Sequence, residues 1–323
     1  MLKDIPHPDD FERNGLAFLN LAWDSIAELS QTHHTVTEMM NTSYISEEDR
    51  LEMEEVEETY WQNSQPALAT AVALAHQGGE FLLKSRIAAI SPFLLLSVDK
   101  WPANTDGADK SFADFKTVDA QELIKIHDMV CANPLPSKFK TNFENLRKLR
   151  NTIMHSVHRE RPFTPREGVL AILDIADTLI GPLSWQSVRF KYREQKIEIW
   201  NVDASEFNPR HRYAEETMHV IRELLEPAAS LKYYDFNKKQ HSYFCVGCFE
   251  EYAGLVFTVH LKPASSTATE AYCVSCQTTF PVRRKKCDEC EGNVFGKDRW
   301  DDGWTCLTCN DGWLEEETEG TLE

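Results

Sequence analysis

The chain has 323 residues, of which 42% are hydrophobic and 27% charged, and its formal net charge at pH 7 is -18. This length allows two domains, and the strong negative charge disfavours a general nucleic-acid coating protein or a binder of anionic membranes. No stretch approaches the roughly 18 to 20 consecutive apolar residues of a membrane helix, and the N-terminus lacks an apolar signal region. We therefore expect a cytoplasmic protein without a membrane partner.

The first 184 residues show the spacing of amphipathic helices, with apolar side chains three or four positions apart. Pro8 and the aspartates after it are typical of a helix start, whereas Gly181 and Pro182 are typical of a helix end. The expected helices cover 9–33, 46–58, a segment from just beyond Pro66 to about 87, 119–129, 142–155 and 165–180. This pattern predicts an α-helical bundle over residues 1–184.

Residues 185–240 are predicted to be a connector. Apolar residues alternate over 185–200, which indicates a hairpin of short strands, and 213–225 again has helical spacing. The remaining segment, 241–323, is set apart by its cysteines. The predicted fold class is thus mainly α, with a helical bundle followed by a small β-rich module.

Eight of the nine cysteines occur in four pairs with two residues between the partners: Cys245/Cys248, Cys273/Cys276, Cys287/Cys290 and Cys306/Cys309. In such a tight turn both thiolates can reach one ion at about 2.3 Å, and two turns complete a tetrahedron. The spacing therefore predicts two structural zinc ions in tandem zinc ribbons. Four cysteines also hold iron–sulfur clusters, but paired knuckles at hairpin separation favour zinc.

Two pairings of the cysteine knuckles are open. Pairing in sequence order joins 245/248 with 273/276 and 287/290 with 306/309, whereas a nested arrangement joins the two central pairs and encloses them with the outer ones. Both arrangements fill each metal position with cysteine and leave none for a water molecule, so the metals are expected to be structural rather than catalytic. The remaining cysteine, Cys131, is expected in the core.

The C-terminal module is acidic, with 15 acids against 7 Lys and Arg over 241–323. Four successive cations, 283–286, are able to touch phosphates, but three tryptophans offer anchors for a protein surface: Trp300, Trp304 and Trp313. A protein partner that binds the ribbons is therefore at least as well supported as nucleic acid.

The segment 143–155 carries the residues best suited to chemistry. At about 100° per residue, Arg147, Asn151 and His155 fall on one line of the helix and Arg150 borders it. Residues 138–166 hold eight Lys and Arg but only two Glu, a local charge of +6 in an acidic chain. This pattern predicts a basic helix face that presents Arg, Asn and His.

Arg150-Asn151-x3-His155, together with Gln77-Gly-Gly-Glu80-Phe-Leu-Leu-Lys84-Ser-Arg86, resembles the HEPN superfamily (higher eukaryotes and prokaryotes nucleotide-binding) of the Arg-x4-His ribonuclease type. The resemblance covers about residues 10–184 and implies a homodimer that cleaves RNA without a metal. It assigns His155 as acid/base, Arg150 as the group that stabilises phosphate charge, and Asn151 as an orienting group. Arg147, His158 and Arg159 are the expected substrate-binding residues, and Glu80 is a weaker candidate for a supporting role.

The resemblance further implies a toxin or antiviral defence effector, with the ribbons recognising a target or partner. HEPN toxins silenced by a nucleotidyltransferase usually carry Tyr two residues after the His, and Val157 stands there, so that control is not supported. Two other functions stay open. One is a non-catalytic HEPN and zinc-ribbon interaction or nucleotide-binding protein, and the other is a DNA-binding regulator, which the acidic ribbon module disfavours.

Overall fold

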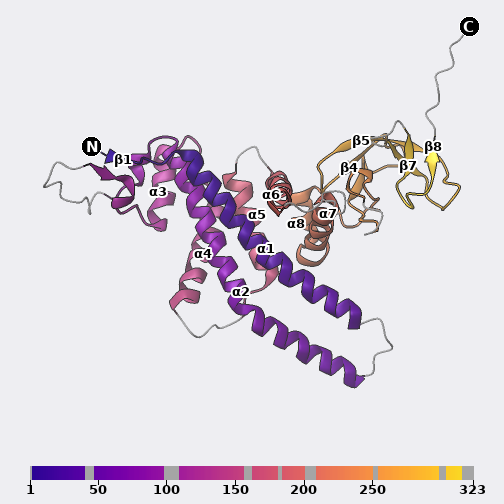
Figure 1. The fold of residues 1–323 in the computed structure, drawn as a ribbon, viewed down its shortest axis with the longest axis horizontal. Helices are drawn as coiled ribbons and strands as arrows, with labels where there is room; N and C mark the ends of the chain where they lie inside the picture. The colour runs from indigo at the N-terminus through magenta and orange to yellow at the C-terminus, as the bar shows by residue number, and fades with distance from the viewer. Residues whose placement is uncertain are drawn as a thin grey trace, which may run out of the picture. The chain divides into compact units, whose positions relative to one another are not determined.

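The computed structural model describes residues 2–40, 47–97, 109–155, 162–180, 184–200, 209–249, 254–297 and 303–314. The chain divides into two compact units, Met1–Trp185 and Gln186–Glu323. The first is helical apart from a pair of two-residue strands, and the second joins helices to a six-stranded sheet (Figure 1). The expectation of a mainly α chain with a small β-rich C-terminal part is confirmed.

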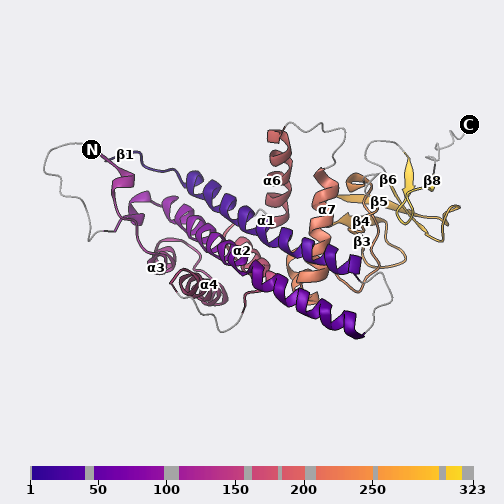
Figure 2. The same cartoon turned by 60° about the horizontal axis from the view of Figure 1, so that its bottom comes forward.

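The first unit consists of long helices with short strand and 3-10 segments between them. Its elements are β1 (Leu2–Lys3), α1 (Pro8–Met40), α2 (Glu47–Ala88), η1 (Pro92–Leu95), β2 (Lys110–Ser111), η3 (Phe112–Asp114), α3 (Ala120–Val130), α4 (Ser137–His155) and α5 (Pro165–Leu179). Helices α1 and α2 run side by side as an antiparallel pair (Figures 1 and 2). Helices α3, α4 and α5 pack against α2, which makes α2 the central helix of this unit.

Helix α2 corrects the prediction of two separate helices on either side of Pro66, because it continues through this proline. Proline removes one backbone donor, but Pro66 is exposed and its ring faces solvent. The next turn buries Leu68 completely, and Gln65 donates to the carbonyl of Phe163 and accepts from its amide at 3.1 and 2.9 Å. Burial of the helix therefore outweighs the loss of one hydrogen bond.

Small residues in α2 allow its neighbours to approach closely. A Cβ atom on Gly79 would lie 2.6 Å from Cε2 of Phe143 in α4, a distance that Cβ atoms do not tolerate. Phe143 also stacks on His76 at 4.9 Å between ring centroids. This contact brings the polar side chains of α2 beside the basic residues of α4.

The second unit begins with helices, where the sequence predicted a hairpin of strands over 185–200. These are α6 (Trp185–Trp200), α7 (Pro209–His219), the π-helix η4 (Val220–Leu224) and α8 (Pro227–Tyr234). The hairpin prediction was wrong because side chains three positions apart are buried together, as in a helix: Trp185 with Val188, and Gln186 with Arg189, which is 1% exposed. The segment predicted as a connector thus belongs to the same unit as the cysteines.

The sheet of the second unit follows a short 3-10 turn, η5 (Val246–Cys248). Its strands are β3 (Val259–Lys262), β4 (Glu270–Cys273), β5 (Thr279–Arg284), β6 (Val294–Lys297), β7 (Trp304–Cys306) and β8 (Trp313–Leu314), and each pairs antiparallel with the next. Buried residues form two clusters along this sheet, each of which contains one set of cysteines. None of the helices in the described residues has both the length and the apolar character needed to cross a membrane.

Candidate functional site

The eight paired cysteines form two groups of four, and these follow sequence order rather than the nested alternative. Cys245, Cys248, Cys273 and Cys276 make one group, and Cys287, Cys290, Cys306 and Cys309 make the other. In each group the sulfur atoms all lie within 4.8 Å of one another. Hairpins place the knuckles together, since β3 and β4 lead from the first pair to the second and β6 and β7 lead from the third to the fourth.

The sulfur separations fit a tetrahedral metal centre. A tetrahedron with metal–sulfur bonds of about 2.3 Å has edges of about 3.8 Å. In the first group the Sγ atoms of Cys245 and Cys276 are 3.8 Å apart and those of Cys248 and Cys273 are 3.9 Å apart. The second group gives 3.8 Å for Cys287 to Cys309 and 3.7 Å for Cys290 to Cys306. Both groups therefore have the geometry to bind a metal ion.

Neighbouring polar groups support the sulfur atoms. Thr258 Oγ1 lies 3.1 Å from the Sγ of Cys273, and the amide of Gly292 donates to the Sγ of Cys290 at 3.2 Å. Such contacts orient thiolates and offset part of their negative charge. The remaining cysteine, Cys131, lies in the first unit, is half-buried and joins neither group.

Arg150 lies at the centre of the basic candidate site on α4. Its Nη1 donates to Oδ1 of Asn151 at 3.0 Å, and its Nη2 lies 3.5 Å from Oε1 of Glu80 on α2. The Arg150 side chain keeps 31% of its exposure, so part of the guanidinium faces solvent. The structure therefore brings together Arg150, Asn151 and the supporting candidate Glu80.

Arg147, an expected substrate-binding residue, is engaged by a carboxylate of its own helix. It pairs with Glu144 through two hydrogen bonds of 2.8 Å, and this pairing raises the pKa of the Arg147 guanidinium. A bidentate carboxylate offsets the charge that a phosphate would need. Arg147 is therefore less available to bind a substrate phosphate than a cation without a carboxylate partner.

His155 is the last residue of α4, one helical turn beyond Asn151, and its backbone is helical. The position of its side chain lies outside what the structure describes, as do His158 and Arg159. Helix geometry alone places positions four residues apart on the same face, so His155 follows Asn151 along the line of the helix.

His76 is a neighbour of this site that the sequence interpretation missed. Its ring is fully buried, with Nδ1 3.2 Å from Oε1 of Glu80, yet neither ring nitrogen forms a well-aligned hydrogen bond with a described residue. Burial, aided by the charges of Arg150 and Arg147, lowers the pKa of His76 to about 4, so the ring is neutral at pH 7. Burial also raises the pKa of the Glu80 carboxyl.

The spacing of His76, Glu80 and Lys84 could have revealed this cluster. These residues are four apart, so on one helix they form a polar line along an otherwise apolar segment. Lys84 is half-buried, and burial lowers its pKa while Glu80 opposes that change. A row of titratable side chains on a buried helix is typical of a functional face or of a polar contact between helices.

Comparison of the chain with protein-family models, with curated proteins and with solved structures gives no significant match.

Proposed function

We propose that the first unit is a metal-independent endoribonuclease of the HEPN type, in which His155 and Arg150 act on RNA. The observation that carries this proposal is the side chain of Arg150. It is partly exposed, oriented by Asn151 and Glu80, and carried by the helix that ends at His155. The surrounding segment has a local charge of +6, which favours a polyanionic substrate in an otherwise acidic chain.

The proposed chemistry uses the ribose 2′-hydroxyl of RNA as the nucleophile. A histidine takes the 2′-OH proton, the O2′–P bond forms, and the guanidinium of Arg150 stabilises the charge of the phosphorane. The P–O5′ bond then breaks and the leaving oxygen takes a proton. The products are a 2′,3′-cyclic phosphate and a 5′-hydroxyl, and Asn151 keeps Arg150 in position.

The carboxylates near Arg150 favour this route over two-metal catalysis. Glu80 contacts Arg150, and Glu144 pairs with Arg147, so both are already engaged by guanidinium groups. Two-metal sites need several carboxylates that converge on their ions. Among the described residues, the groups of three or more possible metal ligands are the two cysteine sets.

The proposal gives the second unit a structural and recognition role. Two zinc ions in all-cysteine sites would be structural rather than catalytic, because such sites leave no position for a reacting water. They would stabilise the sheet that carries the cysteines. The ribbons would then recognise a target or a protein partner. The homodimer and the role as a toxin or antiviral effector rest on analogy with the HEPN superfamily.

Cleavage of RNA by the purified full chain in EDTA tests the proposed function. His155→Ala should lower the cleavage rate by about 10² to 10⁴, because it removes the group that transfers the proton. Arg150→Ala should lower the rate by about 10² to 10³ through loss of charge stabilisation. Lys148→Ala is the matched control, since Lys148 is a cation on the same helix with 66% exposure, and it should change the rate little.

Two outcomes would contradict the assignment: cleavage that stops in EDTA while the fold persists, or cleavage that is unchanged in His155→Ala. Either would favour the second candidate, a non-catalytic interaction or nucleotide-binding protein. The observation in favour of this alternative is that Glu80 and Asn151 already occupy donors of Arg150, as in a structural contact between α2 and α4. A structural Arg150 would appear as loss of stability rather than loss of activity.

A further inference from the structure

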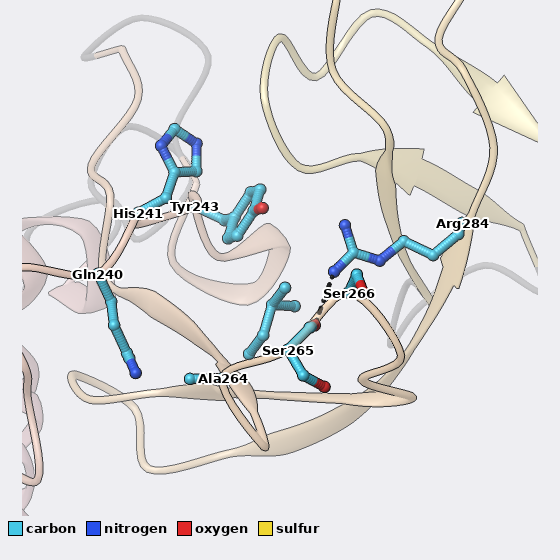
Figure 3. A pocket seen from close by; sticks show the side chains of 8 residues that line it. Gln240, His241, Tyr243, Ala264, Ser265, Ser266 and Arg284 are labelled. Carbon is cyan, nitrogen blue, oxygen red and sulfur yellow. Dashed lines mark hydrogen bonds between the residues drawn. The ribbon is translucent and has the colours of Figure 1, made fainter.

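A pocket in the second unit has none of the paired cysteines in its lining. Its volume is about 320 Å³, and it is lined by Gln240, His241, Tyr243, Leu261, Ala264, Ser265, Ser266 and Arg284. Figure 3 shows His241 and Tyr243 on one side, Arg284 reaching in from the other, and Ser265 and Ser266 between them. Pockets of about 300 to 1,000 Å³ that combine apolar walls with a few polar groups are typical of small-ligand sites.

The aromatic wall is formed by two neighbouring rings. His241 and Tyr243 meet edge to face with centroids 4.7 Å apart. Tyr243 is anchored because its backbone exchanges hydrogen bonds with Val259 at 2.9 and 2.8 Å, whereas the side chain of His241 is exposed. Tyr243 is 9% exposed and meets the His241 ring at 78°, so the exposed His241 ring is the face on which a nucleobase can stack, and Tyr243 supports that ring from the side.

The opposite wall carries a charge that no carboxylate neutralises among the described residues. Arg284 donates to Oδ1 of Asn293 at 3.0 Å and to the carbonyl of Ser265 at 3.2 Å, and both acceptors are neutral. A guanidinium has five N–H donors, so donors remain for a ligand. These two contacts hold the charge at the pocket, where it suits an anion such as a phosphate.

The chain next to the pocket is also basic. Arg284 stands within the run Arg283 to Lys286, four successive cations. Lys285 and Lys286 are exposed and form no ion pair with any residue that the structure describes, whereas Arg283 lies over the Trp304 ring at 4.1 Å. This local positive charge contrasts with the acidic module around it and adds a long-range attraction for an anion at the pocket.

We propose that this pocket binds a nucleotide, with the base against His241 and the phosphate on Arg284. Gln240 and the two serines would supply hydrogen bonds to the base edge and the sugar. An acidic peptide would satisfy Arg284, but it would leave the aromatic wall without a flat partner. The site is independent of RNA cleavage, so it extends the protein beyond the function proposed for the first unit.

Binding to the full-length, metal-loaded protein tests the proposal. One probe is a fluorescein-labelled 2′-O-methyl oligouridylate, which 2′-hydroxyl chemistry cannot cleave and whose binding is followed by fluorescence anisotropy. The other probes are UMP and AMP, whose binding is measured by calorimetry. Arg284→Gln should weaken binding about tenfold, because it removes a charge-assisted phosphate contact. His241→Ala should also weaken it about tenfold through loss of stacking. Binding of UMP or AMP at comparable strength identifies a free nucleotide as the ligand, and binding of the oligonucleotide alone identifies a strand.

Lys285→Gln is the matched control, because it removes the same charge one residue away but does not line the pocket. It should change affinity about twofold at most if the pocket is the site, since only long-range attraction is lost. Equal losses in Arg284→Gln and Lys285→Gln would overturn the proposal in favour of general electrostatic attraction. The absence of binding by any probe, or affinity that is unchanged in both Arg284→Gln and His241→Ala, would also overturn it. Because His241 is exposed, its variant keeps the test decisive if Arg284→Gln misfolds.

Discussion

Arg150 illustrates how a single side chain serves the fold and the proposed reaction together. Glu80 and Asn151 hold its guanidinium, and the buried Glu80 belongs to the central helix. An RNA phosphate would compete with Glu80 for Arg150, because the contact between these two side chains is long, at 3.5 Å, and the Arg150 side chain is partly exposed. A contact of this length is weaker than a hydrogen bond of ordinary geometry, so a substrate phosphate can compete with it.

The lowered pKa of His76 should make the stability of the first unit depend on pH. Its pKa is about 4 in the folded chain against an ordinary value of 6.5, with burial as the main cause. Between these values the unfolded chain binds a proton that the folded chain does not, so stability falls as the pH drops through this window. The full effect is about 3 to 4 kcal/mol, because one pKa unit corresponds to about 1.4 kcal/mol.

The variant His76→Phe should remove this dependence, because phenylalanine keeps the ring against Phe143 and has no nitrogen to protonate. Denaturant unfolding of the first unit at about pH 7 and about pH 5 gives the slope, and His7→Gln, at an exposed position, should retain the wild-type slope. The raised pKa of the Glu80 carboxyl acts in the opposite direction as the pH falls, so the test compares the two slopes with each other rather than with a slope of zero. Equal slopes in wild type and His76→Phe would contradict this prediction.

Helices α6 and α7 are joined by a buried ion cluster. Arg189 donates to Oε1 of Glu216 at 2.7 Å, and Arg193 contacts Oε2 of the same carboxylate. The side chains of Arg189 and Glu216 are 1% and 3% exposed, so water does not stabilise their charges and each charge is stabilised by the other. The two guanidinium groups also lower the pKa of Glu216 against the effect of burial, which keeps it ionised.

Glu216→Gln should therefore destabilise the second unit by about 3 to 5 kcal/mol, because it leaves the buried Arg189 guanidinium without its counter-charge. Glu215→Gln is the control on the same helix, since Glu215 is 49% exposed and a surface charge contributes little. Denaturant unfolding followed by tryptophan fluorescence measures both. A loss of similar size in the two variants would show that the cluster has no special role in joining α6 to α7.

The second cysteine group depends on a close approach of backbone to sulfur. A Cβ atom on Gly312 would lie 2.5 Å from the Sγ of Cys287 and 3.1 Å from the Cβ of Cys306. The carbonyl of Gly312 also accepts from the amide of Cys306 at 2.9 Å, which closes the last knuckle. An alanine at this position must displace one ligand.

We predict two zinc ions per wild-type chain and about one in Gly312→Ala, because the clash disturbs a single site of the two. Asp311→Ala, next to it and exposed, should retain both ions. Elemental analysis of the purified proteins measures the zinc content. Iron in place of zinc, or two full sites in Gly312→Ala, would show that the assignment is wrong.

On the scale of the whole molecule, the proposed nuclease requires a dimer, because one chain offers a single Arg150 and His155 set. The full chain should therefore have twice the 37.1 kDa mass of one chain in light scattering. Closed twofold symmetry is the commonest form of a homo-oligomer, and it would bring two identical motifs face to face. A chain that stays monomeric at high micromolar concentration, yet cleaves RNA, would exclude a shared cleft.

The sequence by itself determined the local features of this protein. Helical periodicity located α3 and α5 to within one residue, and the Cys-x-x-Cys spacing identified the four knuckles whose sulfur atoms could bind metal. Both signals are short-range, because they follow from the geometry of one turn of chain. The role of the Arg150 and His155 motif stays a prediction, since no described contact tests catalysis.

Only the tertiary structure decided which distant parts meet. It paired the knuckles in sequence order, continued α2 through Pro66, made α6 a helix, and placed the neutral His76 and Glu80 beside Arg150. These outcomes depend on the free energy of burying whole surfaces, which outweighs the local preference of a few residues. The proposed nucleotide pocket also depends on tertiary structure, because His241 and Arg284 come from separate segments that the sheet brings to one cavity.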